Sequence, residues 1–275
     1  MHQVFLETTA IAERIFGVPE SINYVESLCK NKTLLSSTYV WGEFRRTFLN
    51  DTIICHQVFS NSFERGDNLP TALKRLARFE KIRYKPRKLR REWDIVARLH
   101  ESKFETLKEA IDRLENDILY ELEIYFFKGL KKPLLNGANC KMTSDTPVAI
   151  GSPEKITFEL ASKCTRIERP ECEIVSFWKS HRSDLEAVSA AQIPPGFTGK
   201  SKVEIQSFIN AALEILNNIE RSPKEAYGKR CYAVIADLII CIEAPRQTPI
   251  ITTNCGHYTF LCSALKMPAP FCFKQ

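Results

Sequence analysis

The amino-acid sequence predicts an α/β fold built on a parallel sheet, with a long insertion in the middle of the chain. Two short apolar segments, residues 4–7 and 249–252, have the length and composition of buried strands. Helical patterns surround both segments, and strands that are separated by helices favour a parallel sheet. The middle of the chain lacks this alternation, so we interpret it as an addition to the sheet domain.

The first strand is expected at residues 4–7, where an apolar run ends on Glu7. Thr8 and Thr9 follow it directly and are expected to cap a helix that reaches about Phe16, because hydroxyl side chains accept hydrogen bonds from the first turn. The N-terminal part of the chain therefore predicts a strand followed directly by a helix.

A second helix is expected after the small hydroxyl residues 36–38 and runs to about residue 50. Its apolar side chains recur at helical spacing and form one stripe, with Glu43 at the margin of that stripe. A carboxylate at such a margin is available to a site beside the core.

The insertion, residues 61–199, is expected to have a helical part at 69–129 and an irregular part at 130–199, with Pro86 breaking the helical part. Ten basic residues fall within residues 74–91, a density that favours contact with phosphates. A solvated helical face or a docking site for an acidic partner explains the same charge. The expected RNA contacts in this segment are Arg87, Lys88, Arg90 and Arg91.

The C-terminal part predicts a helix at 202–220 capped by Ser201, a second helix at 232–244, the strand at 249–252 and a short helix at 258–265. The second of these helices is apolar almost all round and carries Asp237 within its apolar run.

Composition and charge suit an ordinary globular protein of 275 residues with a net charge of +6. The N-terminus lacks the pattern of a signal peptide, and the purest apolar stretch, residues 232–242, is too short to span a bilayer. We therefore expect a cytoplasmic protein without a membrane partner. The ten cysteines are scattered through the chain, which favours reduced, buried thiols over a disulfide framework.

Asp237 is the strongest candidate for a functional residue. An ionised carboxylate inside an apolar helix is destabilising by several kcal/mol, on the order expected for buried charges, unless a metal ion, a cation or hydrogen-bond donors compensate it. A structural explanation is an aspartate that caps a neighbouring backbone or pairs with an arginine.

Other oxygen ligands are expected near Asp237. Glu7 and Asn254 each follow an apolar strand, and the carboxyl ends of parallel strands line the ligand crevice of an α/β sheet. Glu43 is expected on an adjacent helix. Such a cluster suits Mg²⁺ or Mn²⁺, which bind carboxylates, waters and substrate phosphates and thereby promote phosphodiester hydrolysis.

At these positions the sequence resembles the PIN-domain nucleases, a family of metal-dependent ribonucleases. Four segments in order are similar to the four motifs of the family: Val4-Phe5-Leu6-Glu7-Thr8, the helix that carries Glu43, Ala236-Asp237-Leu238-Ile239, and Ile251-Thr252-Thr253-Asn254-Cys255-Gly256-His257-Tyr258. The resemblance covers roughly residues 1–60 and 200–275 and implies a PIN-like three-layer α/β/α core there.

The resemblance also implies an activity and a set of roles. Glu7, Glu43 and Asp237 would hold the metal ion, Asn254 would complete the quartet, and Thr252 would position a phosphate or a water. The implied activity is that of an endoribonuclease, such as a toxin or defence-system effector controlled by a protein inhibitor. Glu7 stands where the family usually has Asp, and Asn254 removes a charge, so a catalytically degenerate module that binds RNA or protein is the alternative.

Two further sites remain open. His257 follows Asn254 closely and is a candidate for phosphate contact, although a histidine at a helix start also caps or packs. A structural Zn²⁺ could be held in the irregular segment by Cys140, Cys164, Cys172 and His181, but their spacing contains no CxxC pair, which favours buried or incidental thiols. The amphipathic stretch 105–127 would suit docking of a protein partner.

Overall fold

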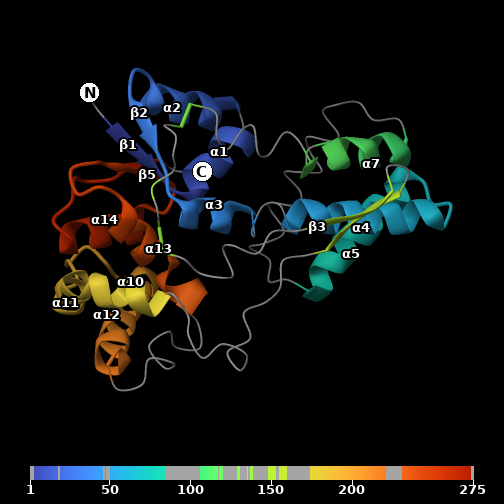
Figure 1. Cartoon of the computed structure of the whole chain (residues 1–275). Helices are drawn as coiled ribbons and strands as arrows, with labels where there is room; N and C mark the ends of the chain where they lie inside the picture. The colour runs from blue at the N-terminus through green and yellow to red at the C-terminus, as the bar shows by residue number, and fades with distance from the viewer. Residues whose placement is uncertain are drawn as a thin grey trace. The chain divides into compact units, whose positions relative to one another are not determined.

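In the computed structural model the chain forms two compact units (Figure 1). Unit 1 combines Met1–Glu43, Gly129–Ser144 and Lys163–Gln275, and unit 2 combines Phe44–Lys128 and Asp145–Ser162. The described residues are 3–17, 19–45, 47, 50–83, 106–116, 118–119, 129–130, 135, 137–138, 148–152, 155–159, 174–220 and 231–273.

Unit 1 contains the parallel sheet that the sequence predicts. Within the described residues the sheet has four strands in the order β2-β1-β5-β6, namely Thr33–Leu35, Gln3–Leu6, Ile250–Thr252 and Phe271–Cys272. All three strand pairs are parallel, with Val4 opposite Leu34, Phe5 opposite Ile250 and Thr252 opposite Cys272. The predicted α/β class is confirmed.

Both faces of the central strands are covered. Val4, Phe5 and Leu6 are consecutive and fully buried, as are Ile250 and Ile251, although successive side chains of a strand point to opposite faces. The covering helices of unit 1 include α1 (Thr8–Phe16), α2 (Pro19–Cys29), α3 (Thr38–Phe44), α12 (Gly199–Asn218), α13 (Cys231–Glu243) and α14 (Cys255–Ala264). This arrangement is compatible with an α/β/α fold of three layers.

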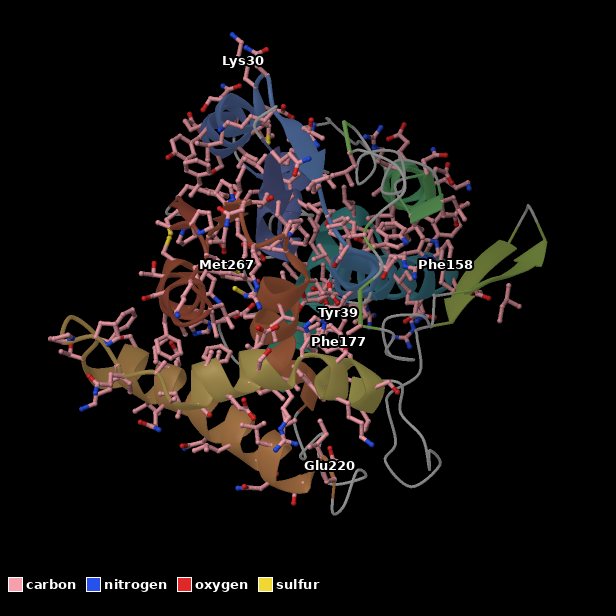
Figure 2. All side chains as sticks on the ribbon, turned by 60° about the vertical axis from the view of Figure 1, so that its left-hand side comes forward. Lys30, Tyr39, Phe158, Phe177, Glu220 and Met267 are labelled. Carbon is pink, nitrogen blue, oxygen red and sulfur yellow. The ribbon has the colours of Figure 1, made fainter. Side chains whose placement is uncertain are left out.

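The core of unit 1 is built mainly from these helices and the sheet. The apolar side of α13 is buried along its length, from Ile235 to Ile242. Tyr39 on α3, which is 1% exposed, points into the interior (Figure 2). None of the helices in the described part of the chain is long and apolar enough to cross a membrane.

Unit 2 consists of helices and one hairpin. Helices α4 (Asn50–Glu64), α5 (Leu69–Arg83) and α7 (Leu107–Asn116) pack around a core that consists of Cys55, Phe59, Ala72, Leu76, Leu107, Ala110, Ile111 and Leu114. The antiparallel strands β3 (Val148–Ser152) and β4 (Lys155–Glu159) form a hairpin that contacts α4, where Gln57 Nε2 donates to the carbonyl oxygen of Phe158 at 2.9 Å. Phe158 also packs with Ile53 and Ile118 in a second apolar cluster.

Several expected boundaries differ in the structure. The helix that carries Glu43 ends at Phe44 instead of residue 50, and residues 44–60 belong to unit 2 instead of the sheet unit. The segment 163–199 belongs to unit 1, and there the structure has two helices, α10 (Ile174–Ser180) and α11 (Arg182–Ser189), where irregular structure was predicted. The flanking prolines misled the sequence interpretation, although buried Leu185 and Val188 show helical spacing.

The helix caps were also predicted imperfectly. Glu7 caps α1 with its own carboxylate, in place of the threonines that follow it. Thr198 occupies the N-cap position of α12, three residues before the predicted cap, and Ser201 donates to the carbonyl oxygen of Thr198 at 2.8 Å. Helix α2 and strands β2 and β6 were not predicted, because each is short or lies in a segment of mixed composition.

The chain also adds residues to the outer edge of the sheet beside β2. Leu130 forms a parallel bridge with Leu34, and Leu135 forms one with Ser37. Near this edge the buried carboxylate of Glu243, at the end of α13, accepts a hydrogen bond from the backbone N–H of Ala138. The contact fastens the returning segment to unit 1.

Gly17 ends α1, and its N–H donates to the carbonyl oxygen of Glu13 at 2.8 Å. A Cβ atom at this position would overlap that same carbonyl oxygen. We expect Gly17→Ala to lower the free energy of unfolding by about 1–3 kcal/mol, the range for overpacked sites, as measured by urea denaturation. Gly196→Ala is the matched control, because no described atom lies within 4 Å of its Cβ position. Equal stability of the two variants would contradict the prediction.

The buried carboxyl of Glu243 should make the free energy of unfolding depend on pH. Burial raises the pKa of this carboxyl to about 7, against the opposing hydrogen bonds from Ser37 and Ala138. Above about pH 4.5 the unfolded chain loses this proton while the folded chain keeps it, so the stabilisation is full below pH 4.5 and is lost as pH rises to about 7.

We therefore expect the unfolding free energy of the wild type to fall more steeply across this window than that of Glu243→Gln. The difference in slope should be about 1 kcal/mol per pH unit. Glu214→Gln, which removes an exposed carboxylate from α12, should keep the slope of the wild type. If the unfolding free energies of the wild type and Glu243→Gln change with pH at the same slope, the folded protein does not keep a proton on Glu243.

Candidate active site

The candidate site lies where the connections of the parallel sheet diverge. From β1 the chain passes through α1 and α2 to β2 on one side, and from β5 it passes through α14 to β6 on the other side. In open α/β sheets, ligands bind outside the carboxyl ends of strands at such a switch point. Glu7 follows β1, and Thr253 and Asn254 follow β5, so the predicted strand-end residues stand at this point.

Glu7 is buried and is bonded to two elements at once. Its carboxylate accepts from the backbone N–H groups of Thr9 (2.9 Å) and Ala10 (3.2 Å) and from the hydroxyl of Thr9, all in the first turn of α1. The hydroxyl of Thr252, the last residue of β5, donates to it as well. These four donors occupy the roughly four acceptor positions of an ionised carboxylate.

The protonation of Glu7 is finely balanced. Burial raises the pKa of its carboxyl to about 7, and the nearby charge of Asp237 acts in the same direction. The hydrogen bonds from Thr9 and Thr252 act in the opposite direction, because they stabilise the carboxylate. Glu7 therefore titrates near neutral pH, and its charge depends on Asp237.

Thr9 extends the contacts of Glu7 to the residue after β5. Its hydroxyl oxygen, which donates to Glu7, accepts from the backbone N–H of Thr253 (3.1 Å) and from the Thr253 hydroxyl (2.7 Å). The ends of β1 and β5 and the start of α1 are thus joined through one hydroxyl group.

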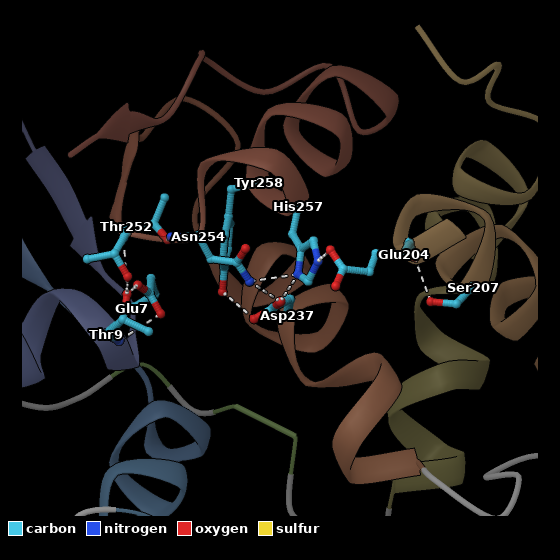
Figure 3. Close-up of polar contacts among 10 residues, drawn as sticks. Glu7, Thr9, Glu204, Ser207, Asp237, Thr252, Asn254, His257 and Tyr258 are labelled. Atoms are coloured by element: carbon cyan, nitrogen blue, oxygen red, sulfur yellow. Dashed lines mark hydrogen bonds and ion pairs between the residues drawn. The ribbon is translucent and has the colours of Figure 1, made fainter. Parts of the chain in front are cut away.

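Asp237 lies on α13 and receives donors from the start of α14 (Figure 3). Oδ2 accepts from Asn254 Nδ2 at 2.9 Å and lies 2.7 Å from His257 Nδ1, and Oδ1 accepts from the Tyr258 hydroxyl at 3.3 Å. The side chain of Asp237 is 23% exposed. Three protein donors compensate the charge that the surrounding apolar helix cannot solvate.

His257 is held between two carboxylates. Its Nδ1 faces Asp237, and its Nε2 lies 3.5 Å from Oε2 of Glu204 on α12. The ring of Phe208 packs against the imidazole edge to face, with centroids 5.0 Å apart. Burial by itself lowers the pKa of His257, but the hydrogen bond and charge of Asp237, aided by Glu204, outweigh it and raise the pKa above its ordinary value. The raised pKa favours the protonated imidazole between these two carboxylates.

The buried phenol of Tyr258 contacts Asp237 and is also influenced by the charges of two further carboxylates. Burial raises the pKa of this hydroxyl well above its ordinary value, and the charges of Asp237, Glu7 and Glu43 each raise it further. These acids come from α13, from the end of β1 and from α3. Glu43 is also joined to α1, because the Thr8 hydroxyl donates to its Oε2. The predicted acids thus share one neighbourhood around a buried phenol.

The metal centre predicted from the sequence stays a prediction. Among the described residues, no group of three or more His, Cys, Asp or Glu side chains is arranged to hold a metal ion. Glu7 turns its carboxylate to the helix start, where protein donors occupy it.

Some of the remaining predicted site residues lie at the site, and others lie outside the described residues. Thr252 and Asn254 lie at the site, where the Thr252 hydroxyl accepts from the Asn254 backbone N–H at 2.9 Å. Arg87, Lys88, Arg90 and Arg91 lie outside the described residues, as do the proposed zinc ligands Cys140, Cys164 and Cys172. The fourth, His181, is described, and its Nδ1 lies 3.0 Å from Oδ2 of Asp184 in the same turn.

Sequence reasoning missed Thr9, Tyr258, Glu204 and Thr253 as members of the site. Thr9 and Thr253 were readable as neighbours of predicted strand ends, and Tyr258 as the residue one position beyond His257. Glu204 gave no local signal, because it lies on a helix whose place beside α14 is set by tertiary packing.

Comparisons of this chain with protein-family models, with curated proteins and with solved structures found no match. The chemistry of the site therefore rests on its own geometry.

The hydroxyl of Thr9 should stabilise the junction of β1, α1 and β5. Thr9→Val keeps the branched shape but removes a donor to Glu7 and the acceptor of two Thr253 donors. We expect a loss of about 1–3 kcal/mol in unfolding free energy in urea at pH 7, because buried polar groups lose their partners. Thr9→Ser retains the hydroxyl and should lose less than half as much. If the two variants are equally stable, the bridge has no energetic role.

Proposed function

We propose that this chain is a metal-dependent endoribonuclease with a PIN-like core, and that its catalytic centre is the switch-point site around Asp237. The observation that carries the proposal is the hydrogen-bonded pair of Asp237 and Asn254 at the carboxyl end of the sheet, with the charges of Glu7 and Glu43 also acting on the neighbouring Tyr258 hydroxyl. Folded proteins rarely gather three acids from separate elements unless a cation or a reaction uses the charge.

The residues of the site suit different tasks in this reaction. Asp237 and Glu43 would hold Mg²⁺ or Mn²⁺, and the bound ion would supply activation of a water and neutralisation of charge on the phosphate. Glu7 would fix the geometry of the strand ends. His257 places its imidazole beside Asp237, and Asn254 and Thr252 offer polar groups to a phosphate or a water.

The substrate in this proposal is RNA. The net charge of +6 and the basic segment within residues 74–91 support attraction to a phosphate backbone, which acts before any base is recognised. An effector of this kind in the cytoplasm, such as a toxin or a defence nuclease, would be controlled by a protein inhibitor.

Cleavage of labelled single-stranded and hairpin RNAs, with Mg²⁺ or Mn²⁺ and with EDTA, tests the proposal. We expect EDTA to stop cleavage and Asp237→Asn and Glu43→Gln each to reduce it by at least about 100-fold, because each removes charge that stabilises the transition state. Glu214→Gln removes an exposed carboxylate of α12 and should keep wild-type activity. Circular dichroism and urea titration verify folding. Full activity of folded Asp237→Asn would overturn the assignment.

A second candidate function is a catalytically degenerate PIN-like module that binds RNA or protein. The observation in its favour is that protein groups already bond to both carboxylates. Glu7 contacts four such groups and Asp237 contacts three. In that case the wild type would bind RNA with an affinity that falls steeply with salt, and no products would form with either metal ion.

A further inference from the structure

Three sulfur atoms meet between α13 and α14, apart from the candidate active site. The Sγ atoms of Cys241 on α13 and Cys262 on α14 lie 3.9 Å apart, and Cys241 Sγ lies 3.7 Å from Sδ of Met267, which follows α14 and is labelled in Figure 2. The two cysteines stand one helical turn beyond Asp237 and Tyr258, which are hydrogen-bonded between the same two helices. The sulfur atoms therefore belong to the interface that also carries the site.

The end of α14 fixes Met267 in relation to Cys262. Helix α14 ends at Ala264, and Lys266 then takes a left-handed backbone conformation with a φ of 54°. The Met267 N–H donates to the carbonyl oxygen of Cys262 at 2.8 Å, and the Lys266 N–H donates to that of Ser263 at 3.2 Å. These are the two hydrogen bonds of a Schellman motif, so the turn that carries the thioether is held by the backbone.

The spacing of the sulfur atoms fits a metal ion with three sulfur ligands. Bonds of about 2.3 Å, the usual length of a metal–thiolate bond, hold three sulfur ligands about 4 Å apart when the ion lies in their plane. The two distances from Cys241 Sγ, 3.9 and 3.7 Å, are close to this value. Packed sulfur atoms also approach this closely, so the ligand types and their surroundings decide whether an ion fits.

The three ligands are soft, and their softness selects the ion. Thiolate and thioether sulfur favour Cu(I), whereas a structural zinc site takes four ligands, mostly from cysteine and histidine. At this place the described residues supply no third histidine, cysteine, aspartate or glutamate to such a set. A methionine as the third ligand therefore points to Cu(I) and away from Zn²⁺.

The surroundings of the three sulfur atoms are dry. Cys241 and Cys262 are 0% and 1% exposed, and Met267, at 9%, is the most exposed of the three ligands and marks the side from which an ion enters. Exclusion of water and of nitrogen and oxygen ligands favours Cu(I) over Cu(II), because Cu(II) prefers those ligands in tetragonal geometry.

The charge of the bound ion has a partner on the loop after α13. Two thiolates exceed the charge of one Cu(I), so the complex is an anion that an apolar interior does not solvate. The guanidinium of Arg246 interacts electrostatically with Cys241, and its Nη1 donates to the carbonyl oxygen of Leu265 at 3.4 Å. Arg246 also pairs with Asp184, so it offsets part of the negative charge.

We propose that Cys241, Cys262 and Met267 form a Cu(I) site that joins α13 to α14. On binding, each thiol loses its proton to the solvent and forms a Cu–S bond, and the thioether donates an electron pair without losing a group. The copper keeps its oxidation state throughout, so the step needs no oxidant and no reductant. This site is separate from the proposed Mg²⁺ or Mn²⁺ ligands, and it does not depend on nuclease activity.

Competition for Cu(I) tests this site in the full chain. The reduced protein is titrated without oxygen against the Cu(I) chelator bathocuproine disulfonate, and the copper transferred is followed by the absorbance of the chelate. We expect the wild type to take up an equimolar amount of Cu(I). Cys262→Ala and Met267→Leu should each weaken the affinity at least about 10-fold, because loss of a ligand exceeds loss of an outer-shell partner. Cys29→Ala, which removes a buried thiol of α2, is the matched control and should bind like the wild type.

X-ray absorption at the copper edge identifies the ligands. With less copper than protein, the wild type should show three sulfur neighbours at about 2.3 Å. Met267→Leu, which conserves the core volume, should show two. Circular dichroism verifies that each variant is folded. The proposal is overturned if folded Cys262→Ala or Met267→Leu binds Cu(I) like the wild type, if nitrogen or oxygen binds the copper, or if the wild type takes no copper from the chelator.

Discussion

The buried carboxylate of Glu7 is the contact on which the site geometry depends. It stands between β1 and α1 and accepts donors from the first turn of α1 and from the end of β5. An unpaired carboxylate at this depth would be strongly destabilising, so the burial of Glu7 and the ordering of Thr9 and Thr252 require one another. Through Thr9 the same network reaches Thr253, which precedes Asn254 at the start of α14.

The charge of Asp237 is compensated by donors from a different element. Its helix is apolar, and the start of α14 supplies the amide of Asn254, the imidazole of His257 and the hydroxyl of Tyr258. Glu7 is enclosed and Asp237 keeps partial exposure, so the two acids are suited to different roles. An enclosed carboxylate holds the scaffold, whereas a partly exposed one can meet an ion or a phosphate. Their mutual repulsion raises the pKa of Glu7 and links the two groups electrostatically.

The comparison of sequence with structure shows which signals are local. The strand at β1 and the helix that carries Asp237 were predicted within one residue at each end, because apolar runs and their boundaries are set by neighbouring residues. The helices α10 and α11 were missed, because their short apolar patterns stand among prolines and gain stability from packing on unit 1. The cap of α1 was assigned to its threonines, since glutamate is an uncommon capping residue and its longer side chain must fold back on the helix.

The sequence by itself determined the α/β class, the placement of Glu7 and Asn254 after apolar strands, and the need of Asp237 for compensation. These follow from periodicity, strand ends and the free energy of burying a charge. The strand order, the engagement of Glu7 by protein donors, the pairing of His257 with Glu204 and the division into two units were decided by tertiary structure alone. The reason is physical: these features depend on distances between residues far apart in the chain, and no local pattern encodes those distances.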